Sequence, residues 1–190
     1  MKVPVREAVR GKGWGHFLLA GLLCLLLPVV VAEEQATTQA EQRAEAVTQV
    51  VLGILSYARW PVEPTQLQLC IVGPTQYTDD LVKGTTQATG RPVTVQRLLA
   101  DHPDIATECN AVYVGRLTND EHARLFASLI GKPVLSISEG GDQCTVGSLF
   151  CLRVGDEQVS FEVNLDSVAR SGVRIHPSVL QLSRRRSATP

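Results

Sequence analysis

The sequence lacks a large excess of charge of either sign. Its 190 residues include 18 lysines and arginines and 19 aspartates and glutamates, and the formal net charge is −1. Without residues 1–32, whose removal we predict below, 14 basic and 18 acidic residues remain. Proteins that bind nucleic acid or anionic lipid through general electrostatics carry a basic surplus. We therefore exclude these partners and expect the basic end, residues 184–190, to be a flexible tail.

The sequence also lacks the glycine motifs of nucleotide-binding proteins. A dinucleotide fingerprint needs three spaced glycines, and a Walker loop needs Gly-Lys-Ser or Gly-Lys-Thr. Gly73 lies between a predicted strand and a predicted helix, where phosphates often bind. It belongs to neither motif, and Asp79 and Asp80 would repel a phosphate. We expect no bound cofactor.

Catalytic motifs are missing as well. There is no Gly-x-Ser-x-Gly elbow of a serine hydrolase. The segment Asp101–Asp104 could place a histidine near Cys109, and Asp156 with Glu157 could pair as acid and base. We interpret the first as a surface loop and the second as a solvated hairpin tip, where no pKa tuning is expected. The prediction is a protein that is not an enzyme.

The longest apolar run is too short for a membrane span. It covers about 15 residues, from Phe17 to Val31, whereas a spanning helix needs about 20. Four basic residues precede it, and Val30-Val31-Ala32 offers a small-residue cleavage site. This pattern is typical of a secretory signal peptide over residues 1–32.

Cysteines are few, and no two have the spacing of a zinc or redox motif. Cys24 leaves with the signal peptide, and Cys70, Cys109, Cys144 and Cys151 remain. An even number in an exported chain indicates disulfides, with three possible pairings. Zinc is disfavoured because the histidines at 102, 122 and 176 are scattered.

The remaining chain alternates short apolar runs with helical patterns. Residues 33–39 are polar and expected to be flexible, and residues 40–183 are expected to form a single domain. The expected order is a helix from Ala40 to Trp60, strands at 67–73, 92–98, 110–115 and 133–138, helices at 78–88 and 118–131, a hairpin at 146–163, and short helices at 164–172 and after Pro177. This order predicts an α/β fold with a mostly parallel sheet flanked by helices, Rossmann-like but without the nucleotide fingerprint, and with a C-terminal β-hairpin.

Four ordered stretches carry a family resemblance. They are "YARWP", "LQLCIVG", "VLSISEG" and "VSFEVNLDSVARSGVRIHPSVLQLS", and the first begins at residue 57 and the last ends at residue 183. Together they resemble the YfiR family of periplasmic regulators. The resemblance implies a repressor that binds the periplasmic region of an inner-membrane diguanylate cyclase, YfiN. It also implies that an outer-membrane lipoprotein, YfiB, sequesters this repressor. It thereby implies control of cyclic di-GMP and biofilm formation. A homodimer is expected, and the alternative is a periplasmic module that binds a small solute at the carboxyl ends of the parallel strands.

Two predictions concern particular residues. The disulfides are expected to be Cys70–Cys109 and Cys144–Cys151, because Cys70 lies in one strand and Cys109 just before another, while Cys144 and Cys151 flank one loop.

The partner- or ligand-binding residues are expected to be Arg59, Trp60, Arg174 and His176, which are hard to assign to the core. Tryptophan and arginine are the residue types that anchor protein interfaces.

Overall fold

The computed structural model describes residues 27–87, 89–140, 146–156 and 158–183. The chain divides into two compact units, residues 1–38 and residues 39–190. Helix α2 (Leu27–Tyr57) begins earlier than the expected start at Ala40, so residues 33–39 are helical in the structure. The reason is that residues 33–46 contain many alanines, glutamates and glutamines, which are good helix formers, and no glycine or proline.

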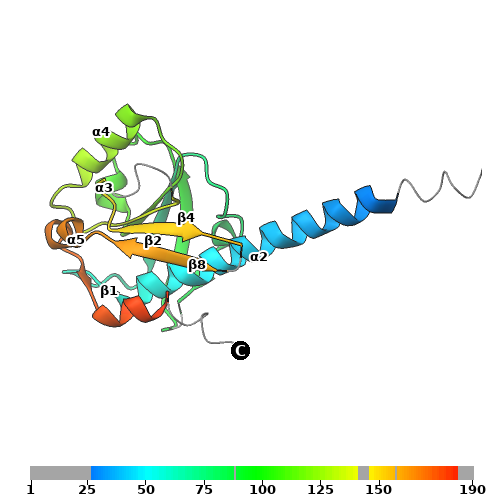
Figure 1. Cartoon of the computed structure of the whole chain (residues 1–190). Helices are drawn as coiled ribbons and strands as arrows, with labels where there is room; N and C mark the ends of the chain where they lie inside the picture. Colours follow the sequence, from blue (N-terminus) through cyan, green and yellow to red (C-terminus); the bar gives the residue numbers. More distant parts are fainter. Residues whose placement is uncertain (1–26, 88, 141–145, 157, 184–190) are drawn as a thin grey trace, which may run out of the picture. The chain divides into compact units, whose positions relative to one another are not determined.

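Short strands and helices follow α2 in an alternating order (Figure 1). They are β1 (Ala58–Arg59), β2 (Leu67–Val72), the 3₁₀ turn η1 (Leu81–Lys83), β3 (Thr85–Thr86), β4 (Pro92–Leu98), α3 (Ile105–Glu108), β5 (Ala111–Val114), α4 (Asn119–Leu129), β6 (Leu135–Ser138), β7 (Phe150–Val154), β8 (Val159–Val163), α5 (Leu165–Ser171), β9 (Arg174–Ile175) and the 3₁₀ turn η2 (Pro177–Gln181).

In the part of the chain that the structure describes, seven strands form the main sheet, in the order β3-β4-β2-β5-β6-β7-β8. The pairs from β4 to β7 are all parallel. The β7–β8 pair at one end is the predicted antiparallel hairpin, and β3 adds an antiparallel edge at the other end. The predicted fold class, a mostly parallel sheet flanked by helices with a C-terminal hairpin, is thus confirmed. A second, two-stranded sheet pairs β1 with β9.

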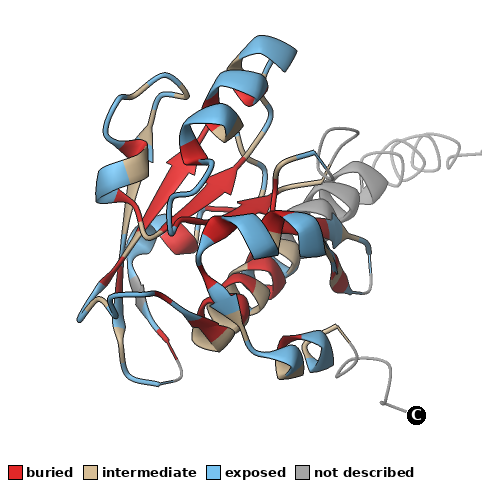
Figure 2. Ribbon diagram, turned by 90° about the vertical axis from the view of Figure 1, so that its left-hand side faces the viewer, coloured by how far each residue is buried: buried red, intermediate tan, exposed pale blue. Residues whose placement is uncertain are grey.

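Each parallel strand packs one set of side chains against α2 and the other set against α3 and α4. On β2, Leu69 and Ile71 belong to the core cluster that includes the apolar side of α2. Cys70 and Val72 belong to the second cluster, which contains residues of α3 and α4. Figure 2 shows the central strands buried between these layers. Burial on both faces explains why the strands read as continuous apolar runs.

Residues close together in the sequence define the ends of two helices, α4 and α5. A capping box starts α4, in which Thr118 and Glu121 bond each other's backbone N–H groups. Asn164 caps α5, and Gly172, with φ 73°, ends it, which agrees with the short helix expected at 164–172.

The expected helix over residues 78–88 was wrong. Only the turn η1 is helical there, and Gly84 interrupts the segment with φ 78°, which favours glycine. Two β-branched residues, Thr85 and Thr86, then pair with β4. Threonine, a β-branched residue, is enriched in strands, which favours extended structure here over a helix. No helix among the described residues is both long and apolar enough to span a membrane.

Candidate functional site

The crevice at the carboxyl ends of β2 and β5 is the usual ligand position of such folds, and here protein atoms fill it. A Cβ added at Gly115 would lie 2.1 Å from the carbonyl oxygen of Pro74, and one added at Gly73 would lie 2.7 Å from Cδ2 of Leu117. The backbone N–H of Arg116 donates to the Pro74 carbonyl at 2.8 Å. The two loops therefore touch each other through their backbones at this point.

Beside these two loops, backbone N–H groups bind a carboxylate side chain of the protein, that of Glu139. Glu139, directly after β6, accepts hydrogen bonds from the backbone N–H groups of Gln76 and Tyr77 at 2.8–3.0 Å and from the hydroxyl of Tyr113 at 2.9 Å. Burial raises the pKa of Tyr113 well above its usual value, and the nearby Glu139 carboxylate raises it further. Tyr113 thus stays protonated and, with the two backbone N–H groups, holds the Glu139 carboxylate in place.

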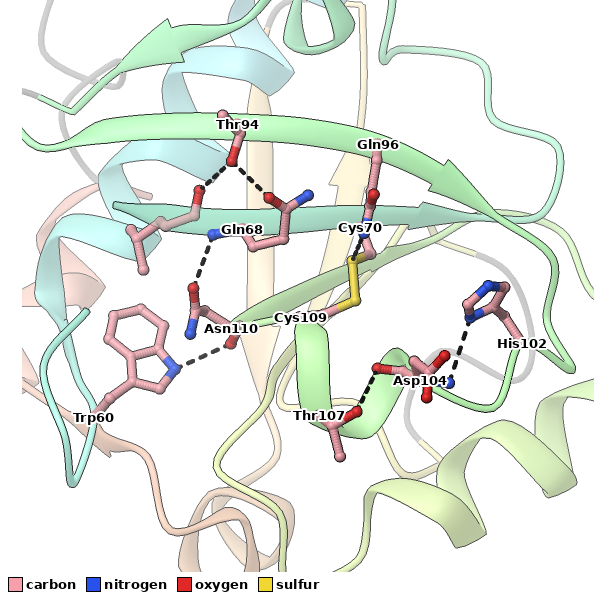
Figure 3. Close-up of a disulfide and its surroundings, with 11 residues drawn as sticks. Trp60, Gln68, Cys70, Thr94, Gln96, His102, Asp104, Thr107, Cys109 and Asn110 are labelled. Carbon is pink, nitrogen blue, oxygen red and sulfur yellow. Dashed lines mark hydrogen bonds between the residues drawn. A yellow bond between two sulfur atoms is a disulfide. The ribbon is translucent and has the colours of Figure 1, made fainter. Parts of the chain in front are cut away.

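The cysteine pair in the sheet is structural. Cys70 of β2 and Cys109, just before β5, form a disulfide with a Cα–Cα distance of 5.9 Å, as predicted (Figure 3). Both residues are buried, so Cys109 is not a nucleophile for the histidine of the Asp101–Asp104 segment. Cys151 is also disulfide-bonded, whereas Cys144 lies outside the described residues. The pairing of Cys144 with Cys151 stays a prediction.

The carboxylate pair at the hairpin tip is only half described. Asp156 pairs with Arg43 of α2, while Glu157 lies outside the described residues. Over the described part of the chain, no three histidine, cysteine, aspartate or glutamate side chains gather where they could hold a metal ion.

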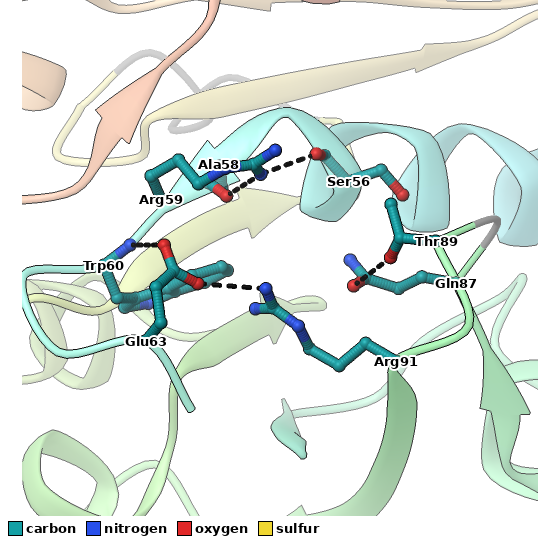
Figure 4. Close-up of polar contacts among 8 residues, drawn as sticks. All are labelled: Ser56, Ala58, Arg59, Trp60, Glu63, Gln87, Thr89 and Arg91. Atoms are coloured by element: carbon teal, nitrogen blue, oxygen red, sulfur yellow. Dashed lines mark hydrogen bonds and ion pairs between the residues drawn. The ribbon is translucent and has the colours of Figure 1, made fainter. Parts of the chain in front are cut away.

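Trp60 lies in the core rather than on a surface. Its side chain is 3 % exposed, and its indole N–H donates to the carbonyl oxygen of Asn110 at 3.0 Å (Figure 3). Its backbone N–H donates to Glu63, whose carboxylate also pairs with Arg91 at 3.0 Å (Figure 4). The expectation that Trp60 anchors a partner from the surface was therefore wrong for the single chain. Proline at 61 ends the strand, and the indole turns inward because it finds both an apolar site and an acceptor.

The other three predicted residues are exposed, and the structure brings them together. In the β1–β9 pair, Arg59 lies directly opposite Arg174, and Ala58 opposite Ile175. His176 follows β9, its backbone N–H donates to the carbonyl of Tyr57, and its ring stacks on the Tyr57 ring at a centroid distance of 6.2 Å. We call Tyr57, Arg59, Arg174 and His176 the β1–β9 patch.

Hydrogen bonds hold two members of the β1–β9 patch, Arg59 and His176. Nη1 of Arg59 donates to the carbonyl oxygens of Ser56 and Ala58 at 2.8 and 2.7 Å, so its guanidinium folds over the end of α2 (Figure 4). Nδ1 of His176 accepts from the backbone N–H of Ser178 and caps η2. Among the described residues, Arg174 forms no ion pair, and Glu162 pairs with Arg153.

The electrostatics of the patch favour an anionic partner. Residues directly opposite in an antiparallel pair project from the same face, so the side chains of Arg59 and Arg174 project from one face. Like charges at such a position destabilise the pair. A carboxylate bound between them would remove this repulsion, and the guanidinium fork matches carboxylate geometry.

Comparison with protein families shows which family the chain belongs to. A family model described as YfiR/HmsC-like matches residues 44–184, which is most of the chain. The chain belongs to the YfiR/HmsC-like family. The match confirms the resemblance read from the sequence.

Membership in the YfiR/HmsC-like family indicates a periplasmic regulator of diguanylate cyclase activity, and the family is regulatory rather than catalytic. The matched region contains the sheet, the Cys70–Cys109 disulfide and all of the β1–β9 patch. The site and the family therefore point to recognition of a partner.

Two residues that organise the fold escaped the reading of the sequence. Asn110 bonds β2 in both directions, through its own N–H to Gln68 and through its side-chain oxygen from the Gln68 N–H, at 2.9 and 2.8 Å. Glu139 is the second of these two residues. A lone asparagine or glutamate in a loop carries no spacing signal, and only the contact across 40 or more residues gives it a role.

Proposed function

We propose that this protein is a periplasmic repressor of an inner-membrane diguanylate cyclase, YfiN, whose periplasmic region it binds. An outer-membrane lipoprotein, YfiB, sequesters the repressor and so releases the cyclase. Residues 1–32 direct export and are removed, and residues 33–190 act in the periplasm, where the chain forms a homodimer. A periplasmic protein has no access to cytoplasmic nucleotide, so it controls the cyclase by shifting the enzyme between two states.

The observation that carries the proposed binding site is the exposed cross-strand pair Arg59 and Arg174. Family membership supports a regulator that acts by binding, and the β1–β9 patch is a surface whose charge repulsion a partner would relieve. Its geometry is also stiff, because Arg59 is held by two backbone carbonyls and His176 by contacts with Tyr57 and Ser178. A preorganised patch loses less conformational freedom when a partner binds.

The test is a charge reversal, Arg59→Glu with Arg174→Glu. We expect the double variant to lose at least about tenfold in affinity for the purified periplasmic region of YfiN or for YfiB, because each carboxylate it meets is now repelled. The matched control is Arg116→Glu with Arg124→Glu, which changes the net charge equally at two other exposed arginines.

Melting temperatures and solution mass are measured for all three proteins. A reversed patch that folds like the parent and still captures both partners with unchanged affinity would show that the β1–β9 patch is not the binding surface. A monomeric mass of the parent at all concentrations would remove the homodimer from the proposal.

A further inference from the structure

The sheet face opposite α2 is incompletely filled next to β6. Leu135 and Ile137 of β6 pack into the α2-side core, whereas Ser136 and Ser138 alternate with them and point to the other face. On the neighbouring strand β5, this face carries Val112 and Val114. Ser136, in place of a large apolar side chain, lines a space between α4 and α5.

This space is a cavity of about 580 Å³. Ligand pockets of proteins have volumes of about 300–1,000 Å³ and are lined mainly by apolar side chains with a few polar groups. Here Phe126, Leu129 and Val134 form apolar wall, and two strongly exposed residues, Ile130 (72 %) and Val146 (62 %), also line it. The size and the lining are those of a small-molecule site.

Two buried polar atoms of the cavity lining have no hydrogen-bond partner in the part of the chain that the structure describes. Nε2 of His122, on α4, and Oγ of Ser167, on α5, form no hydrogen bond with any described residue. The two residues are only 8 % and 6 % exposed. Leaving a buried polar group unpaired is costly in free energy, and such groups in native structures call for an explanation. Both residues line the cavity, so a ligand that supplies two hydrogen-bonding groups would satisfy both atoms once their side chains turn toward it.

The charge of the cavity lining indicates the charge of the ligand. Among the described lining residues, the one side chain with a full charge is Arg170, in the last turn of α5, and it forms no ion pair with a described residue. Burial lowers the pKa of His122, so its imidazole is neutral near neutral pH. An arginine beside an otherwise uncharged apolar cavity favours a carboxylate.

We infer that the cavity between α4 and α5 binds a small amphipathic carboxylate, with its apolar body against Phe126 and its polar end near Ser167 and Arg170. This site is separate from the β1–β9 patch in the sequence and in the residues it uses. It therefore stands or falls independently of the proposed partner surface.

The experiment is a calorimetric titration of the full mature chain with 2-naphthylacetate, and with its neutral isostere 2-naphthylacetamide. We expect saturable binding of the acid and weaker binding of the amide. Ser167→Ala should weaken acid binding about three- to tenfold while leaving the melting temperature equal or higher, because it deletes a hydroxyl that has no partner. A residue with a purely structural role would instead lower the melting temperature.

Two further variants locate the probe. Arg170→Gln should weaken the acid about two- to fivefold and leave the amide unchanged, as expected for an exposed ionic contact. Ala127→Trp places an indole among the lining residues and should abolish binding of both probes. Arg124→Gln on α4, outside the cavity, and the Arg59→Glu/Arg174→Glu variant should bind like the parent.

Three results would overturn the inference. The first is no saturable binding of the acid at millimolar concentration. The second is binding that Ser167→Ala and Ala127→Trp leave unchanged, which would place the probe elsewhere. The third is a pair of findings: the probes fail to bind, and Ala127→Trp prevents capture of YfiN or YfiB. Together they would make the cavity a docking site for a protein.

Discussion

The Cys70–Cys109 disulfide should stabilise this protein mainly through its unfolded state. In the folded chain, the sheet already holds the two cysteines, because β2 and β5 pair in register and Asn110 bonds Gln68 in both directions. The link therefore adds little to the native contacts. In the unfolded chain it closes a loop with a sequence separation of 39 residues.

The magnitude follows from loop closure. A closed loop of that length lowers the entropy of the unfolded chain enough to contribute about 4 kcal/mol. With a urea dependence of about 2 kcal/mol per molar, breaking the link should lower the urea midpoint by about 2 M. A Cys144–Cys151 link, which would close a loop of about seven residues, should contribute roughly 2.5 kcal/mol and about 1.2 M.

The assay compares oxidised and reduced protein in two variants of residues 33–190. Reduction of the Cys144→Ala/Cys151→Ala variant breaks only the Cys70–Cys109 link and keeps its sulfur atoms in the core. Reduction of the Cys70→Ala/Cys109→Ala variant reports the other link in the same way. Trp60 is the one tryptophan of residues 33–190 and is buried, so its emission follows unfolding.

The reasoning fails if reduction of the first variant shifts the midpoint by less than about 0.5 M, or by less than reduction of the second. A non-reducing peptide map that joins Cys70 to Cys144 or to Cys151 would contradict the pairing itself.

Two further predictions concern the filled crevice. Tyr113 is buried in the folded protein, where its pKa is raised above the ordinary value of 10.0. Its hydroxyl therefore resists ionisation in the folded protein but ionises in the unfolded protein. The free energy of unfolding should thus fall as pH rises above about 10, by up to about 1.4 kcal/mol per pH unit, and Tyr113→Phe should reduce this slope in alkaline denaturation curves. Gly115→Ala should lower the free energy of unfolding by about 3 kcal/mol because the Pro74 carbonyl cannot move away. Gly131→Ala, with φ 70° but open space around it, should lower it by only about 1 kcal/mol; equal losses in the two variants would refute the steric explanation.

How much the sequence reveals depends on the range of the interaction. The start of α4 could be predicted because Thr118 and Glu121 bond each other within one turn. The buried strands could be predicted because both faces are apolar, so that each strand is a continuous run. The extent of α2 was missed because helix propensity, and not apolar periodicity, decides residues 33–39.

The candidate site was only partly predictable for the same reason. Arg59, Arg174 and His176 could be selected as charged residues without a place in the core, but their adjacency depends on a pair of two-residue strands more than 100 residues apart. Strands that short carry no alternating pattern. Trp60 was misplaced because the acceptor that holds it, the carbonyl of Asn110, lies 50 residues away.

The central claim is that the chain represses a diguanylate cyclase by binding on the periplasmic side. The measurement that tests it most directly is the cellular concentration of cyclic di-GMP in a strain that expresses YfiN, with and without this protein. Deletion of residues 33–190 should raise cyclic di-GMP, the full chain should lower it again, and the Arg116→Glu/Arg124→Glu variant should act like the full chain. Arg59→Glu/Arg174→Glu should fail to lower it. An unchanged cyclic di-GMP concentration in the deletion strain, with the cyclase present and active, would contradict the account.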